Sequence, residues 1–246
     1  MKIRTCSTLL AVAAVTGAAV VPPASAQDVP QTDVKAKVRA TPTKAGTTAS
    51  PRGHTFRATV KVATEPGFDP PIVTGAEILV GRGVVWNGDD YAKCSKRTLD
   101  RRGPEGCPRK SIMGAGTGTA RADTVITKPD FVFVNAGAER LYVYTTLYHP
   151  ALVQETLVIR RKELRGRWRY HDTFRVPKSL QVVAGVPIQV TGIRFRIGGK
   201  PYARKLVAST SCPRGGWRYR VKVHYLHDLT GERSSDVVAS RIACRR

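Results

Sequence analysis

Hydrophobic and polar residues alternate one by one along several segments of this chain. In segment 217–225, aromatic residues and valines occupy the odd positions, while arginine, lysine and histidine occupy the even ones. The same alternation runs through residues 56–64 and 188–199, and a dense run of β-forming residues covers 140–148. Because successive side chains of a strand point to opposite faces, this pattern is typical of half-buried antiparallel strands.

Residues 155–174 show two further alternating stretches around a turn near residues 163–166. Glycine and proline pairs interrupt the chain roughly every 8 to 15 residues, as expected for tight connections between short strands. The alternation nowhere changes to a helical period for more than about two turns. We therefore predict an all-β fold of about ten to twelve strands, an antiparallel β-sandwich, with a jelly roll as one candidate topology.

The N-terminal 26 residues have the pattern of a secretory signal peptide. Lys2 and Arg4 precede an apolar run at 9–21, and Ala24-Ser25-Ala26 forms a small-x-small cleavage site. The apolar run is too short to span a bilayer as a helix, so cleavage is favoured over a retained N-terminal anchor. No later segment is apolar for 18 residues, so we expect no transmembrane segment after cleavage.

Residues 27–53 are rich in Thr, Ala, Pro and Lys and poor in large apolar side chains. This composition predicts a flexible basic leader, although residues 33–40 alternate and form a candidate edge strand. Residues 54–246 are then expected to form a single β-sandwich domain. The predicted cleavage removes Lys2 and Arg4 and so lowers the formal net charge from +23 to +21.

Four cysteines remain in the predicted mature chain, because Cys6 is removed with the signal peptide. An even number of cysteines in an exported protein is typical of disulfides, and four cysteines allow three pairings. Proximity along the chain favours Cys94–Cys107 and Cys212–Cys244. A four-cysteine zinc site is the alternative, but the close C-x-x-C pairs that such sites use are missing.

No motif in the chain indicates catalysis or a cofactor. The glycine-rich segment 114–118 lacks both the helix of a dinucleotide fingerprint and the lysine of a phosphate loop, so these glycines are expected to serve a turn or a close strand approach. The serine-hydrolase and zinc-protease signatures are absent, and the five histidines are scattered. We therefore assign no catalytic residue, metal ligand or cofactor from the sequence.

Positive charge is the remaining feature, because no acidic residue lies between Asp172 and Asp228. If the strands are neighbours, their outward positions form a basic surface that attracts polyanions. The candidate anion-binding residues are Arg167, Arg169, Arg194, Arg196, Arg218, Arg220 and Lys222. The expected partners are an anionic cell-wall polymer, an acidic polysaccharide or a phospholipid surface. Sequence-specific nucleic-acid binding is not expected, because most aromatic residues fall on the apolar sides of their strands.

Two cysteine-containing segments resemble a pattern found in uncharacterised secreted proteins of high-GC Gram-positive (actinobacterial) bacteria. The matching positions are Cys94, Leu99, Cys107-Pro108, Ser111, Gly114 and Gly116 in the first segment, and Cys212-Pro213, Gly216-Trp217, Tyr219, Val221, Tyr225 and Cys244 in the second. Met113 departs from the pattern, which more often has a β-branched residue there. The resemblance implies an exported, disulfide-bonded β fold and carries no activity with it.

Three functions are compatible with these features. The first is an exported, non-enzymatic protein of the cell envelope or extracellular space that binds an anionic polymer or surface through its basic strand faces. The second is an enzyme acting on an acidic polysaccharide, which would need an acid–base pair in a cleft. The third is a structural or interaction protein at the cell surface, whose charge is incidental.

Overall fold

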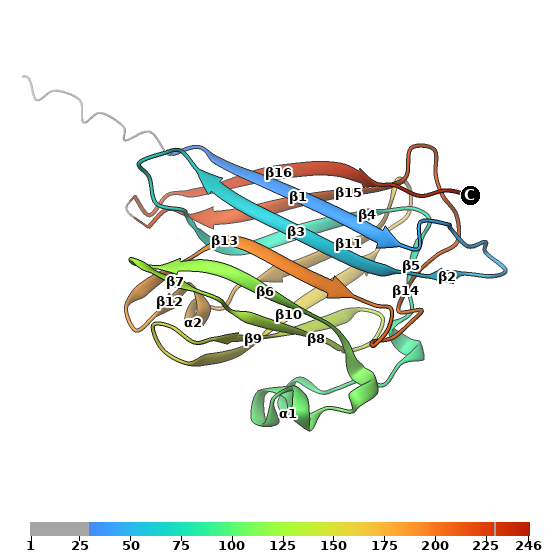
Figure 1. Cartoon of the computed structure of the whole chain (residues 1–246), viewed down its shortest axis with the longest axis horizontal. Coiled ribbons are helices and arrows are strands. Elements are labelled where there is room, and N and C mark those ends of the chain that lie inside the picture. Colours follow the sequence, from blue (N-terminus) through green and yellow to red (C-terminus); the bar gives the residue numbers. More distant parts are fainter. Residues whose placement is uncertain (1–29, 229) are drawn as a thin grey trace, which may run out of the picture.

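The structure is a computed structural model that describes residues 30–228 and 230–246. The predicted signal peptide lies outside these residues. Sixteen strands make up most of the fold (Figure 1): β1 (Thr32–Thr41), β2 (Arg52–Gly53), β3 (Thr55–Thr64), β4 (Ile72–Gly81), β5 (Val84–Trp86), β6 (Ile112–Ala122), β7 (Val125–Thr127), β8 (Asp130–Asn135), β9 (Arg140–Leu147), β10 (Val153–Glu163), β11 (Trp168–Arg175), β12 (Val182–Val183), β13 (Val186–Ile197), β14 (Val207–Ser209), β15 (Trp217–Leu226) and β16 (Arg233–Ile242). Two short α-helices, α1 (Lys96–Arg102) and α2 (Lys178–Gln181), and three 3-10 turns, η1 (Gly88–Asp90), η2 (Pro104–Gly106) and η3 (Arg109–Ser111), complete it.

Thirteen strands form one antiparallel sheet. Its main path runs β1-β3-β13-β6-β8-β9-β10-β11-β4-β15-β16, with β12 beside β13 and β7 beside β6. The sheet folds over, so that β1, β3 and β13 lie in front of β15 and β4 in Figure 1. Its two end strands meet, and the backbone N–H of Val34 on β1 donates to the Asp236 carboxylate on β16 at 2.7 Å. The predicted all-β, antiparallel fold is confirmed, in a form that shares features of a sandwich and a nearly closed barrel.

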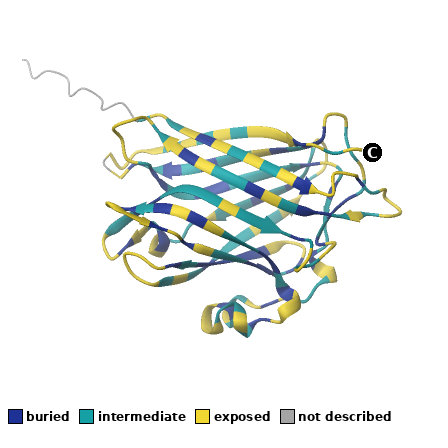
Figure 2. Cartoon of the chain, viewed as in Figure 1, coloured by how far each residue is buried: buried dark blue, intermediate teal, exposed yellow. Residues whose placement is uncertain are grey.

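The alternating segments are strands with one face in the core, as predicted. On β15, Trp217, Tyr219 and Tyr225 are buried, whereas Arg220 between them is exposed. Figure 2 shows this alternation as stripes along the strands. Burying an aromatic or aliphatic side chain of this size contributes about 1.5–3 kcal/mol. The odd-numbered residues of β15 therefore determine both its pairing register and which of its faces points into the core.

The prediction of a flexible leader over residues 27–53 is wrong for Thr32–Thr41. This segment is β1, which pairs with β3 at ten consecutive positions, and the short β2 follows it. Val34 and Ala40 are buried in the core. Small apolar residues at alternate positions are enough to hold an end strand against a neighbour, although the segment lacks the large side chains that identify a central strand. The fold therefore includes β1, and the edge-strand alternative is the one observed.

Both predicted disulfides are present. The Cα–Cα distances are 5.5 Å for Cys94–Cys107 and 5.8 Å for Cys212–Cys244, which are ordinary for a disulfide. The second bond joins the loop before β15 to the segment after β16. It therefore closes the terminal hairpin at the end where that hairpin would otherwise fray.

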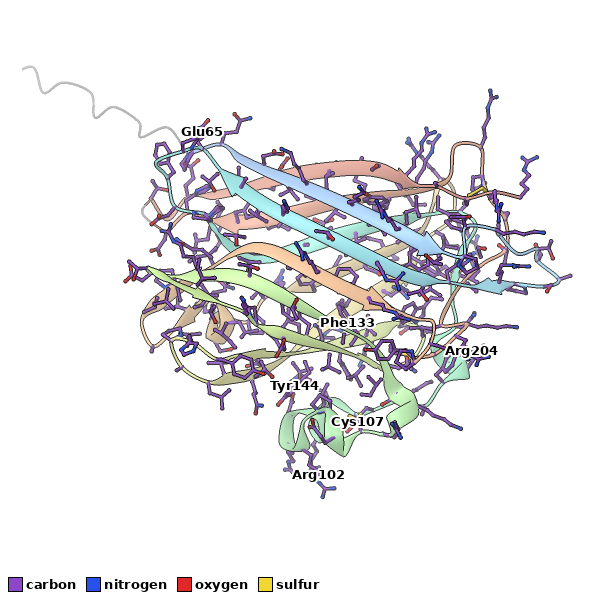
Figure 3. The ribbon with its side chains drawn as sticks, viewed as in Figure 1. Glu65, Arg102, Cys107, Phe133, Tyr144 and Arg204 are labelled. Atoms are coloured by element: carbon purple, nitrogen blue, oxygen red, sulfur yellow. A yellow bond between two sulfur atoms is a disulfide. The ribbon has the colours of Figure 1, made fainter. Side chains whose placement is uncertain are left out.

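The first disulfide staples a flap, residues 94–107, to the outside of the sheet. Within the flap, Ser95 caps α1 by accepting from the Thr98 N–H, and Gly103 ends the helix with φ of 65°. Leu99 is fully buried and packs with both cysteines against Tyr142 and Tyr144 of β9. Figure 3 shows Cys107 and Tyr144 close to this contact.

The glycine-rich segment 114–118 lies inside β6 and precedes no helix. A Cβ atom on Gly114 would stand 2.2 Å from the Arg196 carbonyl oxygen, and one on Gly116 would stand 2.6 Å from the Phe195 Cβ. These glycines allow β6 to approach β13 closely, which is the backbone role expected for them. The segment from Cys94 to Gly118 is therefore a disulfide-closed loop that leads into β6.

Candidate anion-binding surfaces

The seven predicted anion-binding residues fall into two groups on different parts of the sheet. Arg194 and Arg196 lie on β13. Arg218, Arg220 and Lys222 lie on β15, with Arg169 on β11 and Arg167 in the β10–β11 turn. Along the sheet, six strands lie between β13 and β15, namely β6, β8, β9, β10, β11 and β4. The structure therefore does not gather the seven residues into one surface.

The first group belongs to a larger surface on β1, β3 and β13. On each of these strands, outward basic residues alternate with side chains that face the core. We call the following set the front basic face: Lys35, Lys37, Arg39, Arg57, Lys61, Arg194 and Arg196. All of them are exposed except Arg196, which is half-buried. Sequence reasoning missed five of the seven, because β1 was expected to be a leader and the strand order was unknown.

The strand register places like charges directly opposite each other on this face. Arg57 on β3 faces Arg39 on β1 and Arg196 on β13, so three arginines form a row across three strands. Lys61 faces Lys35 in the same way. Directly opposed side chains stand about 5 Å apart at Cβ, and like charges at such positions are destabilising. The fold therefore maintains a concentrated positive charge that its own stability does not require.

Acidic residues hardly compensate this charge. Among the outward positions of β1, β3 and β13, the only carboxylate is Asp33, at the start of β1. Asp33 pairs with Lys35 at 2.9 Å, and its hydrogen bond raises the pKa of Lys35. The guanidinium of Arg196 donates to the Lys200 carbonyl. Within residues 30–228 and 230–246, the other members of the face make no ion pair.

The second group lies on the opposite layer, on β10, β11, β4, β15 and β16. We call its outward cations the back basic face: Arg160, Lys162, Arg175, Arg218, Arg220, Lys222 and Arg241. Like charges also meet here, as at Arg218 and Arg241. The central strand β4, however, presents Gly75, Glu77, Leu79 and Gly81 outward and contributes no cation, so it divides the back basic face into two parts.

Glu77 partly neutralises the middle of the back basic face. Its two carboxylate oxygens each lie 3.1 Å from a histidine Nε2, one on His171 and one on His224, and Lys222 is its partner in the ladder. The hydrogen bond from His224 is the largest cause of a lowered Glu77 pKa, and the bond from His171 acts in the same direction. The front basic face has no comparable group of a carboxylate between two imidazoles.

One basic residue of the 160–169 run points into the core. The guanidinium of Arg161 binds Asp172 through two hydrogen bonds of 2.7 and 2.5 Å, and it lies 4.1 Å above the ring of Trp86. The Tyr170 ring lies 5.1 Å away. The Arg161 and Asp172 side chains are 12% and 8% exposed. This buried pair is satisfied internally and is not accessible to a large anion.

A groove opens between the β4–β5 turn and the β10–β11 turn, with a volume of about 610 Å³. Its lining includes Arg82, Arg165, Arg169, Trp168 and Glu163. Glu163 is the only carboxylate that lines it, and it forms an ion pair with Arg169 at 2.8 Å. No histidine or tyrosine lines this groove. Its lining therefore offers no acid–base pair to an enzyme acting on a polysaccharide.

The histidines are distributed among structural roles. His54 is buried, with its ring nitrogens 2.7 Å from the Pro42 carbonyl and 2.7 Å from the Ser209 hydroxyl, and burial lowers its pKa. His227 is buried 2.8 Å from the Ser234 hydroxyl. Within the described part of the chain, no three His, Cys, Asp or Glu side chains are placed to hold a metal ion. No helix in that part is long and apolar enough to cross a bilayer.

Comparison of the chain with protein-family models, curated proteins and solved structures found no match. The resemblance to secreted actinobacterial proteins stays a prediction.

Proposed function

We propose that this protein is an exported, non-enzymatic binding protein that holds an anionic polymer against its front basic face. The observation that carries the proposal is the row formed by Arg39, Arg57 and Arg196, in which like charges stand opposite each other with no carboxylate between them. A bound polyanion would relieve this repulsion. The positions that cost stability in the free protein would then contribute to affinity.

The spacing of the front basic face suits an extended polymer. Outward residues repeat about every 7 Å along a strand, and neighbouring strands are about 4.8 Å apart. Cations such as Arg57 and Lys61 on β3 therefore form a grid on an open sheet surface. Several weak contacts to one chain add up in affinity, although each exposed ion pair alone contributes little.

The front basic face is suited to binding a partner by its charge and not to recognising nucleic-acid bases. The outward positions of β1, β3 and β13 carry threonine, alanine and glycine between the cations, and none of them is aromatic. Single-stranded nucleic acids are usually held by exposed aromatic side chains on which bases stack. An anionic cell-wall polymer, an acidic polysaccharide or a phospholipid surface is the partner class that this face fits.

Export to an oxidising compartment is part of the proposal. The two disulfides are compatible with such a compartment. The signal-peptide pattern of residues 1–26 supports the same location. Outside the cell, anionic wall polymers and acidic polysaccharides are the abundant polyanions that a basic face would meet.

A charge-neutralisation experiment tests the proposal. The front variant combines Lys37→Gln, Arg39→Gln, Arg57→Gln and Arg194→Gln. The matched back variant combines Arg160→Gln, Lys162→Gln, Arg175→Gln and Arg220→Gln, and it lowers the net charge by the same amount. The measurement is equilibrium binding of the oxidised chain from residue 27 to immobilised polygalacturonate and to vesicles containing phosphatidylglycerol, across a salt series.

The front variant should lose at least about tenfold in affinity at low salt, with a shallower salt dependence, while the back variant stays within about threefold of the wild type. Equal losses in both variants would show that only net charge matters. No binding of the wild type to either probe at low salt would also overturn the proposal.

A further inference from the structure

The groove between the β4–β5 and β10–β11 turns has features of a small-molecule site. Its volume of about 610 Å³ lies within the range usual for ligand pockets. The Nε of Arg82 donates to the Gly166 carbonyl and so joins the two turns that form its walls. Thr48 and Thr210 line the groove from two other loops. Segments far apart in the sequence therefore build this concavity together.

Trp168 distinguishes the groove from the rest of the structure. The indole N–H groups of Trp86 and Trp217 each donate to a backbone carbonyl, at 3.2 and 2.8 Å. The Trp168 indole has no such partner among the described residues, and the side chain is half-buried in the groove wall. Arg167, which does not line the groove, places its guanidinium 5.4 Å from the indole centroid. The indole thus offers the groove an apolar ring surface and a free donor.

The charge of the groove favours an anion. Arg82, Arg165 and Arg169 line it, and Glu163 is engaged by Arg169. Arg165 forms no ion pair within residues 30–228 and 230–246 and lies in the exposed turn at the mouth of the groove. A guanidinium presents paired N–H donors that match the two oxygens of a carboxylate. The groove therefore combines an aromatic residue, two threonines and positive charge without an ion-pair partner.

We propose that this groove binds a carboxylated pyranose sugar, either a free uronic acid or a unit of an acidic polysaccharide. The C–H face of a pyranose ring can pack on the indole, its hydroxyl groups can accept from the indole N–H and exchange hydrogen bonds with the threonines, and its carboxylate can pair with Arg165. The inference does not depend on the front basic face, which lies on other strands.

The test measures binding of single sugars to the oxidised chain from residue 27 by titration calorimetry and ligand-observed NMR. The probes are galacturonic acid and glucuronic acid, with galactose as the neutral counterpart and inorganic phosphate as the simple anion. At least one uronic acid should bind at least about tenfold more tightly than galactose and phosphate. Uniform binding of all four probes, or no uronic-acid binding stronger than about 10 mM, would overturn the proposal.

Two variants locate the site. Trp168→Ala should reduce uronic-acid affinity at least about tenfold, and Tyr148→Ala, which removes another partly exposed aromatic side chain, should leave it unchanged. Because Trp168→Ala could disturb folding, Arg165→Ala provides a second variant in an exposed turn, and it should lower uronic-acid affinity while leaving galactose binding unaffected. Full affinity in Arg165→Ala and in a folded Trp168→Ala variant would overturn the assignment.

The four-residue front variant separates this inference from the proposed function. It should bind single uronic acids like the wild type even though its affinity for the polymer is reduced. If the front variant loses single-sugar binding while Trp168→Ala keeps it, the groove is not the sugar site.

Discussion

Arg39 and Arg57 occupy directly opposite positions on β1 and β3, and both side chains are exposed. Arg57 meets a second arginine, Arg196, on its other side. Two like-charged neighbours at cross-strand positions reduce the stability of the sheet, each by a few tenths of a kcal/mol up to about 1 kcal/mol. Nothing in the core requires an arginine at an outward position, and this arrangement supports the proposed binding of an anionic polymer.

The first prediction is that Arg57→Glu stabilises the protein and weakens its binding. The new carboxylate would stand between Arg39 and Arg196, so that two repulsive pairs become attractive. We expect the free energy of unfolding to rise by about 0.5–1 kcal/mol in urea denaturation at low salt, with a smaller gain at high salt. Binding to polygalacturonate should fall at the same time.

Arg220→Glu is the control for this substitution. Arg220 faces Ala239 on β16 and Leu79 on β4, so reversing its charge relieves no opposed pair. Its stability should change by less than about 0.5 kcal/mol. A loss of stability in Arg57→Glu, or an equal gain in Arg220→Glu, would show that the opposed arginines do not destabilise the sheet.

The second prediction concerns the buried pair of Arg161 and Asp172. Asp172→Asn would leave the guanidinium without its counter-charge inside the fold, and we expect a loss of about 3–5 kcal/mol in the free energy of unfolding. The double variant Arg161→Met, Asp172→Leu removes both charges and should recover most of this loss. Equilibrium urea unfolding of the three proteins checks both statements. If the single variant costs less than about 1 kcal/mol, the pair is more hydrated than its burial indicates.

Much of the fold could be predicted because alternation in sequence and burial in space have the same cause. Residues such as Trp217 and Tyr225 face the core because they are large and apolar at alternate positions, and a linear pattern reveals that directly. The disulfide pairing followed from proximity along the chain. β1 was harder to predict, because Ala36 and Ala40 offer little apolar surface and gain their neighbours only from the tertiary structure.

The candidate site was less predictable, because it depends on strand order. Arg194 and Arg218 fall in one acid-free segment of sequence, yet six strands lie between β13 and β15 along the sheet. Conversely, Arg39 and Arg196 are far apart in sequence and both neighbour Arg57. Arg161 lies in a run of basic residues that is typical of an exposed segment. Only the alternation along β10 indicates that its side chain points inward. Strand pairing between distant segments determines which of these residues become neighbours, and the local composition of the sequence does not show that pairing.

The third prediction is that both disulfides stabilise the fold and that the first one also anchors the flap. In the chain-entropy description, closing loops with sequence separations of 13 and 32 residues contributes about 3 and about 4 kcal/mol. Replacing each pair by serines should lower the melting temperature in scanning calorimetry. The variant lacking Cys94 and Cys107 should also expose the amide of Leu99 to hydrogen exchange, because the disulfide and the buried Leu99 both anchor the flap against β9. Unchanged melting in reductant would contradict the stabilising role of both bonds.

The fourth prediction concerns acid sensitivity at Glu77. Its pKa in the folded protein is lowered from the ordinary value of 4.5, chiefly by the hydrogen bond from His224 and also by the one from His171. A depressed carboxyl pKa contributes stability that is fully present above the unfolded value and is lost as the pH falls through the folded value. Because the Glu77 side chain is 41% exposed, this contribution is small, below about 1 kcal/mol.

Glu77→Gln should therefore be slightly less stable than the wild type at pH 6, and the two proteins should converge as the pH falls below 4.5. Urea unfolding across this range gives the difference directly. As the control, Glu77→Gln is made in a His171→Ala, His224→Ala background, where the convergence should be smaller because the two hydrogen bonds that lower the Glu77 pKa are removed. A Glu77→Gln difference that persists unchanged at pH 3 would mean that the side chain acts through packing and not through its charge.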